Sequence, residues 1–146
     1  VRDNVEKYFI VRISWLFGEH GNNFFKTMLR LGKENKSVRV VSDQIGSPTY
    51  TVDLAKLIVS MIGTDRYGIY HASNEGFCSW YELACETFRL AGMTDVEVHP
   101  VTSGEFPAKA KRPFNSRMSK DKLVKNGFDR LRYWQEALAD YISRIK

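Results

Sequence analysis

The chain has 146 residues, of which 43% are hydrophobic and 13% aromatic, and its formal net charge is +5. This length and composition fit a single folded domain and exclude an intrinsically disordered chain. No apolar run approaches the roughly 20 residues of a membrane span, and no charged segment leads into an apolar one at the start. We therefore expect neither a membrane anchor nor a signal peptide.

Strand-like and helix-like patterns alternate along the chain, which predicts the α/β class. Residues 1–6 resemble the tail of a helix. Strands are predicted at residues 8–17, 38–41, 68–71 and 95–100. Helices are predicted at residues 22–35, 51–62, 79–91, 119–126 and 132–144.

Local signals predict how several of these helices begin. Ser79 and Glu82 form a capping-box pattern, in which each side chain bonds a backbone N–H of the other's turn. Thr49 or Thr51 is expected to cap the second helix, and Ser119 the fourth.

Two loops are the natural places for a ligand. The polar loop at residues 43–50 lies between a predicted strand and a helix N-terminus, although a plain strand–turn–helix connection has the same pattern. The irregular stretch at residues 101–116 exceeds the usual loop length, and such loops are often functional.

Several short motifs occur in the order typical of one enzyme family. They are residues 12–18 (RISWLFG), 21–24 (GNNF), 43–55 (DQIGSPTYTVDLA), 68–74 (GIYHASN), 79–81 (SWY) and 110–113 (AKRP), with Ser116 after the last. Together they resemble the C-terminal half of dTDP-4-dehydrorhamnose reductases, which are extended short-chain dehydrogenases/reductases.

The resemblance implies that residues 1–146 form one substrate-binding domain of a Rossmann-type enzyme. Residues 1–18 would include a helix tail and a strand of the parent's nucleotide-binding sheet. Gly18 and Gly21 are not followed by a third glycine at Phe24, and no tyrosine has a lysine four residues later. The dinucleotide loop and the catalytic Tyr-x-x-x-Lys of the family are thus absent, and the chain alone should be inactive.

The family reduces dTDP-4-dehydro-L-rhamnose to dTDP-L-rhamnose with NADPH or NADH, so the resemblance implies a dTDP-sugar ligand and a coenzyme bound mainly by the other half. The alternatives are another nucleotide-sugar reductase or epimerase, or a stand-alone nucleotide- or protein-binding module. We expect no catalytic residue in this chain.

Trp15 and Arg112 are candidate substrate-binding residues. In the family, the tryptophan of the Arg-x-Ser-Trp motif contacts the sugar nucleotide, and in related reductases an Arg-Pro pair binds the pyrophosphate. A guanidinium pairs well with phosphate oxygens. The alternatives are a core tryptophan and a surface salt bridge.

Asn22, Asn23 and Gln44 complete the candidate set. One of the two asparagines is expected to cap a helix, and the other to face the ligand. Gln44 has a donor and an acceptor, so it either reads a thymine edge or fastens its own loop.

Cys78 and Cys85 are seven positions apart near one helix, too far for a disulfide, and this favours free thiols in a reducing cytoplasm. No Cys/His cluster has metal spacing. The basic residues are dispersed apart from local clusters at residues 109–112 and 120–125. The first suits a nucleotide diphosphate and the second lies on a predicted helix as a solvated face, so we expect no nucleic-acid partner. The strand at residues 8–17 would be bare without the missing sheet, which predicts rearrangement or a homodimer.

Overall fold

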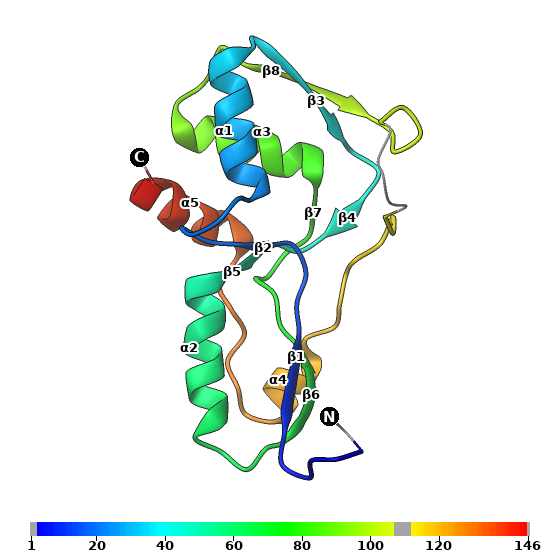
Figure 1. Ribbon diagram of the computed structural model, residues 1–146, viewed down its shortest axis with the longest axis vertical. Helices are drawn as coiled ribbons and strands as arrows, with labels where there is room; N and C mark the ends of the chain where they lie inside the picture. The colour runs from blue at the N-terminus through cyan, green and yellow to red at the C-terminus, as the bar shows by residue number, and fades with distance from the viewer. Residues whose placement is uncertain (1–2, 107–111, 146) are drawn as a thin grey trace.

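Figure 1 shows the computed structural model, which describes residues 3–106 and 112–145. Helices and short strands alternate, so the predicted α/β class is confirmed. The strands are β1 (Phe9–Arg12), β2 (Leu16–Phe17), β3 (Ser37–Val41), β4 (Ile45–Gly46), β5 (Thr49–Tyr50), β6 (Gly68–His71), β7 (Cys78–Ser79) and β8 (Glu97–Val101). The helices are α1 (Phe24–Glu34), α2 (Thr51–Ile62), α3 (Trp80–Ala91), α4 (Asp121–Lys125) and α5 (Trp134–Ile145).

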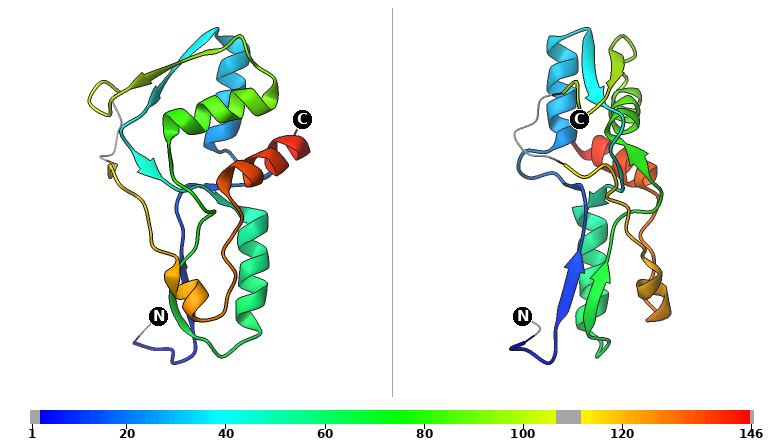
Figure 2. Two further views of the ribbon diagram at one scale, coloured as in Figure 1. Left: turned by 180° about the vertical axis from the view of Figure 1, so that it is seen from behind. Right: turned by 90° about the vertical axis from the view of Figure 1, so that its right-hand side faces the viewer.

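One end of the molecule is built on the parallel pair β1 and β6, in which Phe9 lies opposite Gly68. Helix α2 precedes β6 in the chain and runs alongside the β1–β6 pair (Figures 1 and 2). Helix α4 packs against the same pair from another side. Leu57 and Met61 of α2 meet Tyr70 of β6 in a buried cluster there.

The opposite end is built on a second parallel pair, β3 and β8, covered by α1 and α3 (Figure 2). Along β3 the side chains alternate, so that Val38 and Val40 are buried against Met28 and Phe88 while the intervening residues are exposed. This period of two is what the strand geometry requires when one face is covered.

Helix α5 and the short strands β2, β4, β5 and β7 join the two ends (Figure 1). Phe17, Tyr50 and Tyr141 meet there in an aromatic core, with ring centroids 5.1–6.1 Å apart. Burial of such large rings stabilises the junction strongly.

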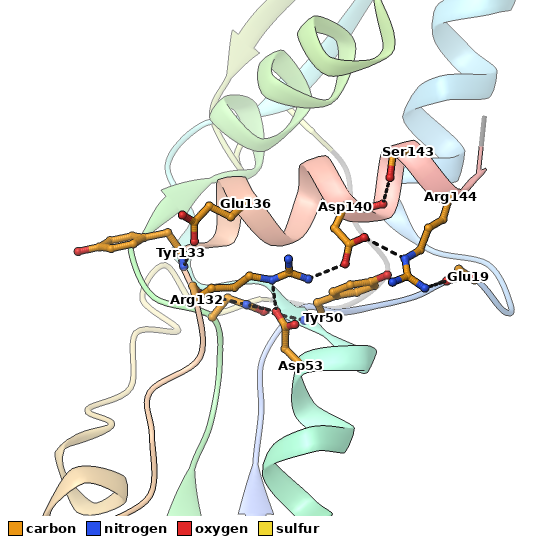
Figure 3. A network of polar contacts seen from close by, with 10 residues as sticks. Glu19, Tyr50, Asp53, Arg132, Tyr133, Glu136, Asp140, Ser143 and Arg144 are labelled. Carbon is orange, nitrogen blue, oxygen red and sulfur yellow. Dashed lines mark hydrogen bonds and ion pairs between the residues drawn. The ribbon is translucent and has the colours of Figure 1, made fainter.

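A network of ion pairs ties α2 to α5 around Arg132 (Figure 3). Arg132 Nε donates to Asp53 Oδ2 at 2.9 Å, and its Nη2 donates to Asp140 Oδ2 at 2.7 Å. Arg144 Nε donates to the other oxygen of Asp140 at 2.9 Å. These bonds hold the pKa of Asp140 below its ordinary value.

The predicted single strand at residues 8–17 is wrong. The backbone turns at Trp15, whose φ is +46°, and this splits the segment into β1 and β2. The expected helix tail is also wrong in the described part, because Asp3–Lys7 form turns and bends.

The predictions of helix ends had mixed success. The range of α2, the range of β6 and the capping box of Ser79 with Glu82 are confirmed. Neither Thr49 nor Thr51 caps α2, because its N-cap is Tyr50 without a side-chain bond. The predicted cap at Ser119 is wrong too, since α4 begins at Asp121 with Lys120 before it.

Candidate functional site

A large cavity of about 910 Å³ opens between α1, β3 and the loop that follows β8. This volume is within the range of small-molecule sites. It lies at the β3–β8 end, and both loops singled out from the sequence reach it, through Gln44 and through Arg112.

Apolar side chains form two walls of the cavity. Phe24, Met28 and Leu31 project from one face of α1, because they are spaced four and three residues apart. Trp80, at the start of α3, adjoins them with its ring 4.8 Å from that of Phe24. A flat, partly apolar ligand such as a nucleobase suits walls of this kind.

A polar cluster lies at the junction of β3 and the loop after β8. Ser103 Oγ donates to Asp43 Oδ1 at 2.6 Å, and Ser103 N donates to Asp43 Oδ2 at 2.9 Å. Gln44 Nε2 donates to Ser103 Oγ at 2.8 Å. The two hydrogen bonds from Ser103 hold the pKa of Asp43 below its ordinary value.

Arg112 is exposed and lines the cavity, next to Phe114. The following segment is fixed against β4, because Ile45 N donates to Phe114 O and Ser116 N donates to Ile45 O, both at 2.8 Å. A guanidinium in this place is available to an anionic group at the cavity. The rest of the basic cluster expected at residues 109–112 lies outside the described residues.

Trp15 does not line the cavity but continues its aromatic wall. Its ring stacks on Trp80 with centroids 3.8 Å apart. The backbone of Gly46 lies against the ring, so closely that a Cβ on Gly46 would be 2.7 Å from two ring atoms. Thr49 N donates to Trp15 O at 3.1 Å and helps hold the left-handed backbone. Such backbone strain in a residue other than glycine is frequent at functional sites.

The prediction that one of the two asparagines caps a helix is confirmed. Asn23 is the N-cap of α1, since its Oδ1 accepts from Lys26 N at 3.0 Å, and its Nδ2 donates to Gly18 O at 2.9 Å and to Tyr141 Oη at 3.0 Å. Its polar atoms are therefore committed within the protein. Asn22 is exposed beside it and is the one that faces outward.

The two glycines weighed as a dinucleotide loop, Gly18 and Gly21, lie between β2 and α1 and have no third glycine at Phe24. Gly18 packs closely on the side chain of Thr51 rather than opening toward a ligand, and Gly21 is exposed two residues before the N-cap of α1. In the described part of the chain, no three His, Cys, Asp or Glu residues are grouped to hold a metal ion. Cys78 and Cys85 are free thiols. Among the described residues, no helix has the length and apolar character needed to span a membrane.

Sequence reasoning missed Ser103, Phe24 and Trp80 as parts of the site. Phe24 and Trp80 have ordinary helical spacing, which signals core packing as readily as a ligand wall. Ser103 lies in the long loop flagged as functional, but nothing local distinguishes it from the other residues of that loop.

Comparisons with known proteins identify the family of the chain. The family model of the RmlD substrate binding domain matches residues 1–146. The spore coat polysaccharide biosynthesis protein SpsK of Bacillus subtilis is 44% identical over 133 residues, which are 91% of this chain and 46% of that protein. A dTDP-4-keto-6-deoxy-D-glucose reductase of Streptomyces niveus is 40% identical over 88% of this chain and 45% of its own length.

A crystal structure of dTDP-4-dehydrorhamnose reductase from Bacillus anthracis in complex with NADP superposes with a TM-score of 0.94 and 48% identity. The superposition includes 99% of this chain and 51% of the crystallised chain. This chain therefore spans about half the length of the relatives it matches. The resemblance noted from the motifs is confirmed, and the chain belongs to the RmlD substrate binding domain family.

Proposed function

We propose that this chain is the sugar-nucleotide-binding half of an NAD(P)-dependent reductase that converts dTDP-4-dehydro-L-rhamnose to dTDP-L-rhamnose. The observation that carries the proposal is the 910 Å³ cavity, which combines aromatic walls, a fixed polar cluster and an exposed arginine. A nucleoside diphosphate sugar offers a matching base and pyrophosphate. The names of similar proteins supply the sugar and the reaction.

In this proposal Arg112 pairs with the pyrophosphate and Gln44 contacts the base. Trp15 and Asn22 face the sugar, while Asn23 supports them by capping α1. The aromatic row from Phe24 through Trp80 to Trp15 provides the apolar surface along which the ligand lies.

The coenzyme, NADPH or NADH, belongs to the other half in this proposal, because this sequence has neither the Gly-rich dinucleotide motif nor a Tyr-x-x-x-Lys pair. The groups that transfer the proton are likewise expected there, so the chain alone should be inactive. Coenzyme oxidation with the 4-keto sugar nucleotide tests this, and turnover above background by the purified chain would refute it.

Binding tests the site itself. In a full-length protein that carries this chain, Arg112→Ala should weaken thymidine diphosphate-sugar binding by about 1.5–3 kcal/mol, the value of a hydrogen bond to a charged group. Trp15→Ala should weaken it as well. Arg30→Ala is the matched control, because Arg30 is exposed and paired with Glu34 on α1. Unchanged calorimetric affinity in both test variants, with the fold intact, would overturn the assignment.

A related substrate is the second candidate. The Streptomyces niveus relative is named for reduction of dTDP-4-keto-6-deoxy-D-glucose, which differs in the sugar and not in the nucleotide. Comparing turnover of the two 4-keto sugars by the full-length protein decides between them. A stand-alone binding module would bind the nucleotide but show no turnover in any full-length form.

We also propose that the chain by itself covers β1 by self-association. Within the described residues β1 pairs only with β6, which leaves its other edge open. Ile58, Val59 and Ile62 of α2 are exposed nearby on the same end. Open edges and apolar patches of this kind are templates for another chain. A clean monomer in light scattering at high concentration would contradict this self-association.

We also propose that the protein is located in the cytoplasm.

A further inference from the structure

The polar cluster at the cavity has a defined direction of hydrogen bonding. Asp43 stays ionised at neutral pH, because the hydrogen bonds from Ser103 keep its pKa low, and an ionised carboxylate only accepts. At 2.6 Å from Asp43 Oδ1, the Ser103 hydroxyl must therefore donate its single proton to Asp43. The remaining role of Ser103 Oγ toward other groups is that of an acceptor.

This direction fixes the amide of Gln44. The atom of Gln44 that lies 2.8 Å from Ser103 Oγ must be the donor, Nε2, because two acceptors would repel one another. The flipped amide is thereby excluded, although the two orientations of a glutamine are otherwise hard to distinguish. Oε1 is left as a fixed acceptor.

The fixed acceptor has no partner among the residues that the structure describes. Gln44 is only 8% exposed and lines the cavity, and no described group donates to its Oε1. An acceptor that a ligand covers without supplying a donor costs free energy. A ligand that places an N–H opposite this oxygen avoids that cost, and one without a donor does not.

We propose that Asp43 and Ser103 are positioning residues, which hold Gln44 so that its Oε1 selects a pyrimidine base with an imide N–H. This inference rests on the proposed function, which places the nucleotide in this cavity. The base rather than the sugar is assigned to Gln44 because the surrounding walls, including Val40 and Phe114, are apolar. A flat ring covers such walls, whereas a sugar would bury hydroxyl groups against them.

The ligand itself provides the sharpest test. Calorimetry on a full-length protein that carries this chain, with its fold confirmed by circular dichroism, compares thymidine 5′-diphosphate with N3-methylthymidine 5′-diphosphate, in which a methyl group replaces the imide hydrogen. We expect the unmethylated ligand to bind at least about 10-fold more tightly, since one buried acceptor is left unpaired otherwise. This comparison needs no variant.

Variants then test the positioning role. Ser103→Ala frees the amide to turn and should reduce the preference to about 2-fold or less, while Ser103→Thr keeps the hydroxyl and should retain it. Ser42→Ala is the matched control: Ser42 Oγ donates to Val101 O at 3.2 Å across the same β3–β8 junction but outside the cavity lining. Its preference should equal that of the parent.

The outcomes separate the two claims. If neither ligand binds to the folded full-length protein, the proposed function fails. If both bind equally, the nucleotide site stands but Gln44 does not read the imide. If Ser103→Ala keeps the full preference, Gln44 reads the imide without help from Ser103, and the positioning role is refuted. A merely structural role of Ser103 would change both affinities together and leave their ratio intact.

Discussion

Asn74 is the polar residue whose loss should destabilise the fold most. It is fully buried, and it joins three segments that are distant in sequence. Its Oδ1 accepts from Tyr50 N at 2.8 Å, at the start of α2. Its Nδ2 donates to Asp53 Oδ2 at 2.7 Å and to Arg132 O at 3.1 Å.

The substitution Asn74→Ala removes these bonds without removing the groups that made them. Tyr50 N–H is left buried and unpaired, which costs about 1–3 kcal/mol. Asp53 loses one charged hydrogen bond, worth about 1.5–3 kcal/mol, but keeps Arg132 Nε. Arg132 O keeps a second donor, Glu75 N, and adds little. We therefore expect a loss of about 2.5–6 kcal/mol, a large part of the roughly 5–15 kcal/mol that stabilises a typical domain.

Urea denaturation followed by circular dichroism measures the free energy of unfolding of parent and variant. Asn35→Ala is the matched control, since Asn35 is exposed and donates one side-chain bond, to Leu31 O at 3.2 Å. It should cost less than about 0.5 kcal/mol. If Asn74→Ala cost no more than the control, Asn74 would not hold the junction and the reasoning from its contacts would be refuted.

Three further changes test other parts of the structure. Gly46→Ala should cost about 1–3 kcal/mol in urea denaturation and alter the near-ultraviolet circular dichroism, because the new methyl group overlaps the stacked ring of Trp15; two unchanged signals would contradict this. Iodoacetamide should modify Cys85 before Cys78, since burial raises the pKa of the Cys78 thiol and shields it; equal rates by mass spectrometry would be inconsistent with that burial. Asp140 has a lowered pKa, so its contribution to stability is present above about pH 4 and is lost as the pH falls through the folded-state value. Asp140→Asn should thus flatten the acid side of the stability profile, and an unchanged profile would argue against the ion pairs.

Sequence patterns predicted the elements whose signals are local. Helix α3 has its capping box and a glycine, Gly92, in the left-handed conformation at its end. The alternation of strands and helices was predicted from hydrophobic periodicity. The family was predicted from the ordered motifs. Of the site, Gln44 and Arg112 were named from the sequence, and the structure places both at the cavity.

The features that the sequence did not reveal depend on contacts between distant segments. An apolar run such as residues 8–17 predicts an unbroken strand. No local pattern in it indicates the left-handed backbone conformation of Trp15. Thr49 is of a residue type that often caps helices and lies just before α2. Its hydroxyl nevertheless donates to Ser14 O at 2.6 Å, 35 residues away in the sequence. Long-range partners of this kind compete with local capping, and only the folded chain shows which of them wins.

The pairing of β3 with β8 sets the order in which the cavity forms. Asp43 and Ser103 are 60 residues apart, so the two rims of the cavity meet only after a long loop has closed. During synthesis Val38 and Val40 leave the ribosome well before the strand that pairs with theirs. The cavity is therefore a late product of folding, and until β8 arrives these valines lack the strand that pairs with theirs and are open to chaperones and to neighbouring chains.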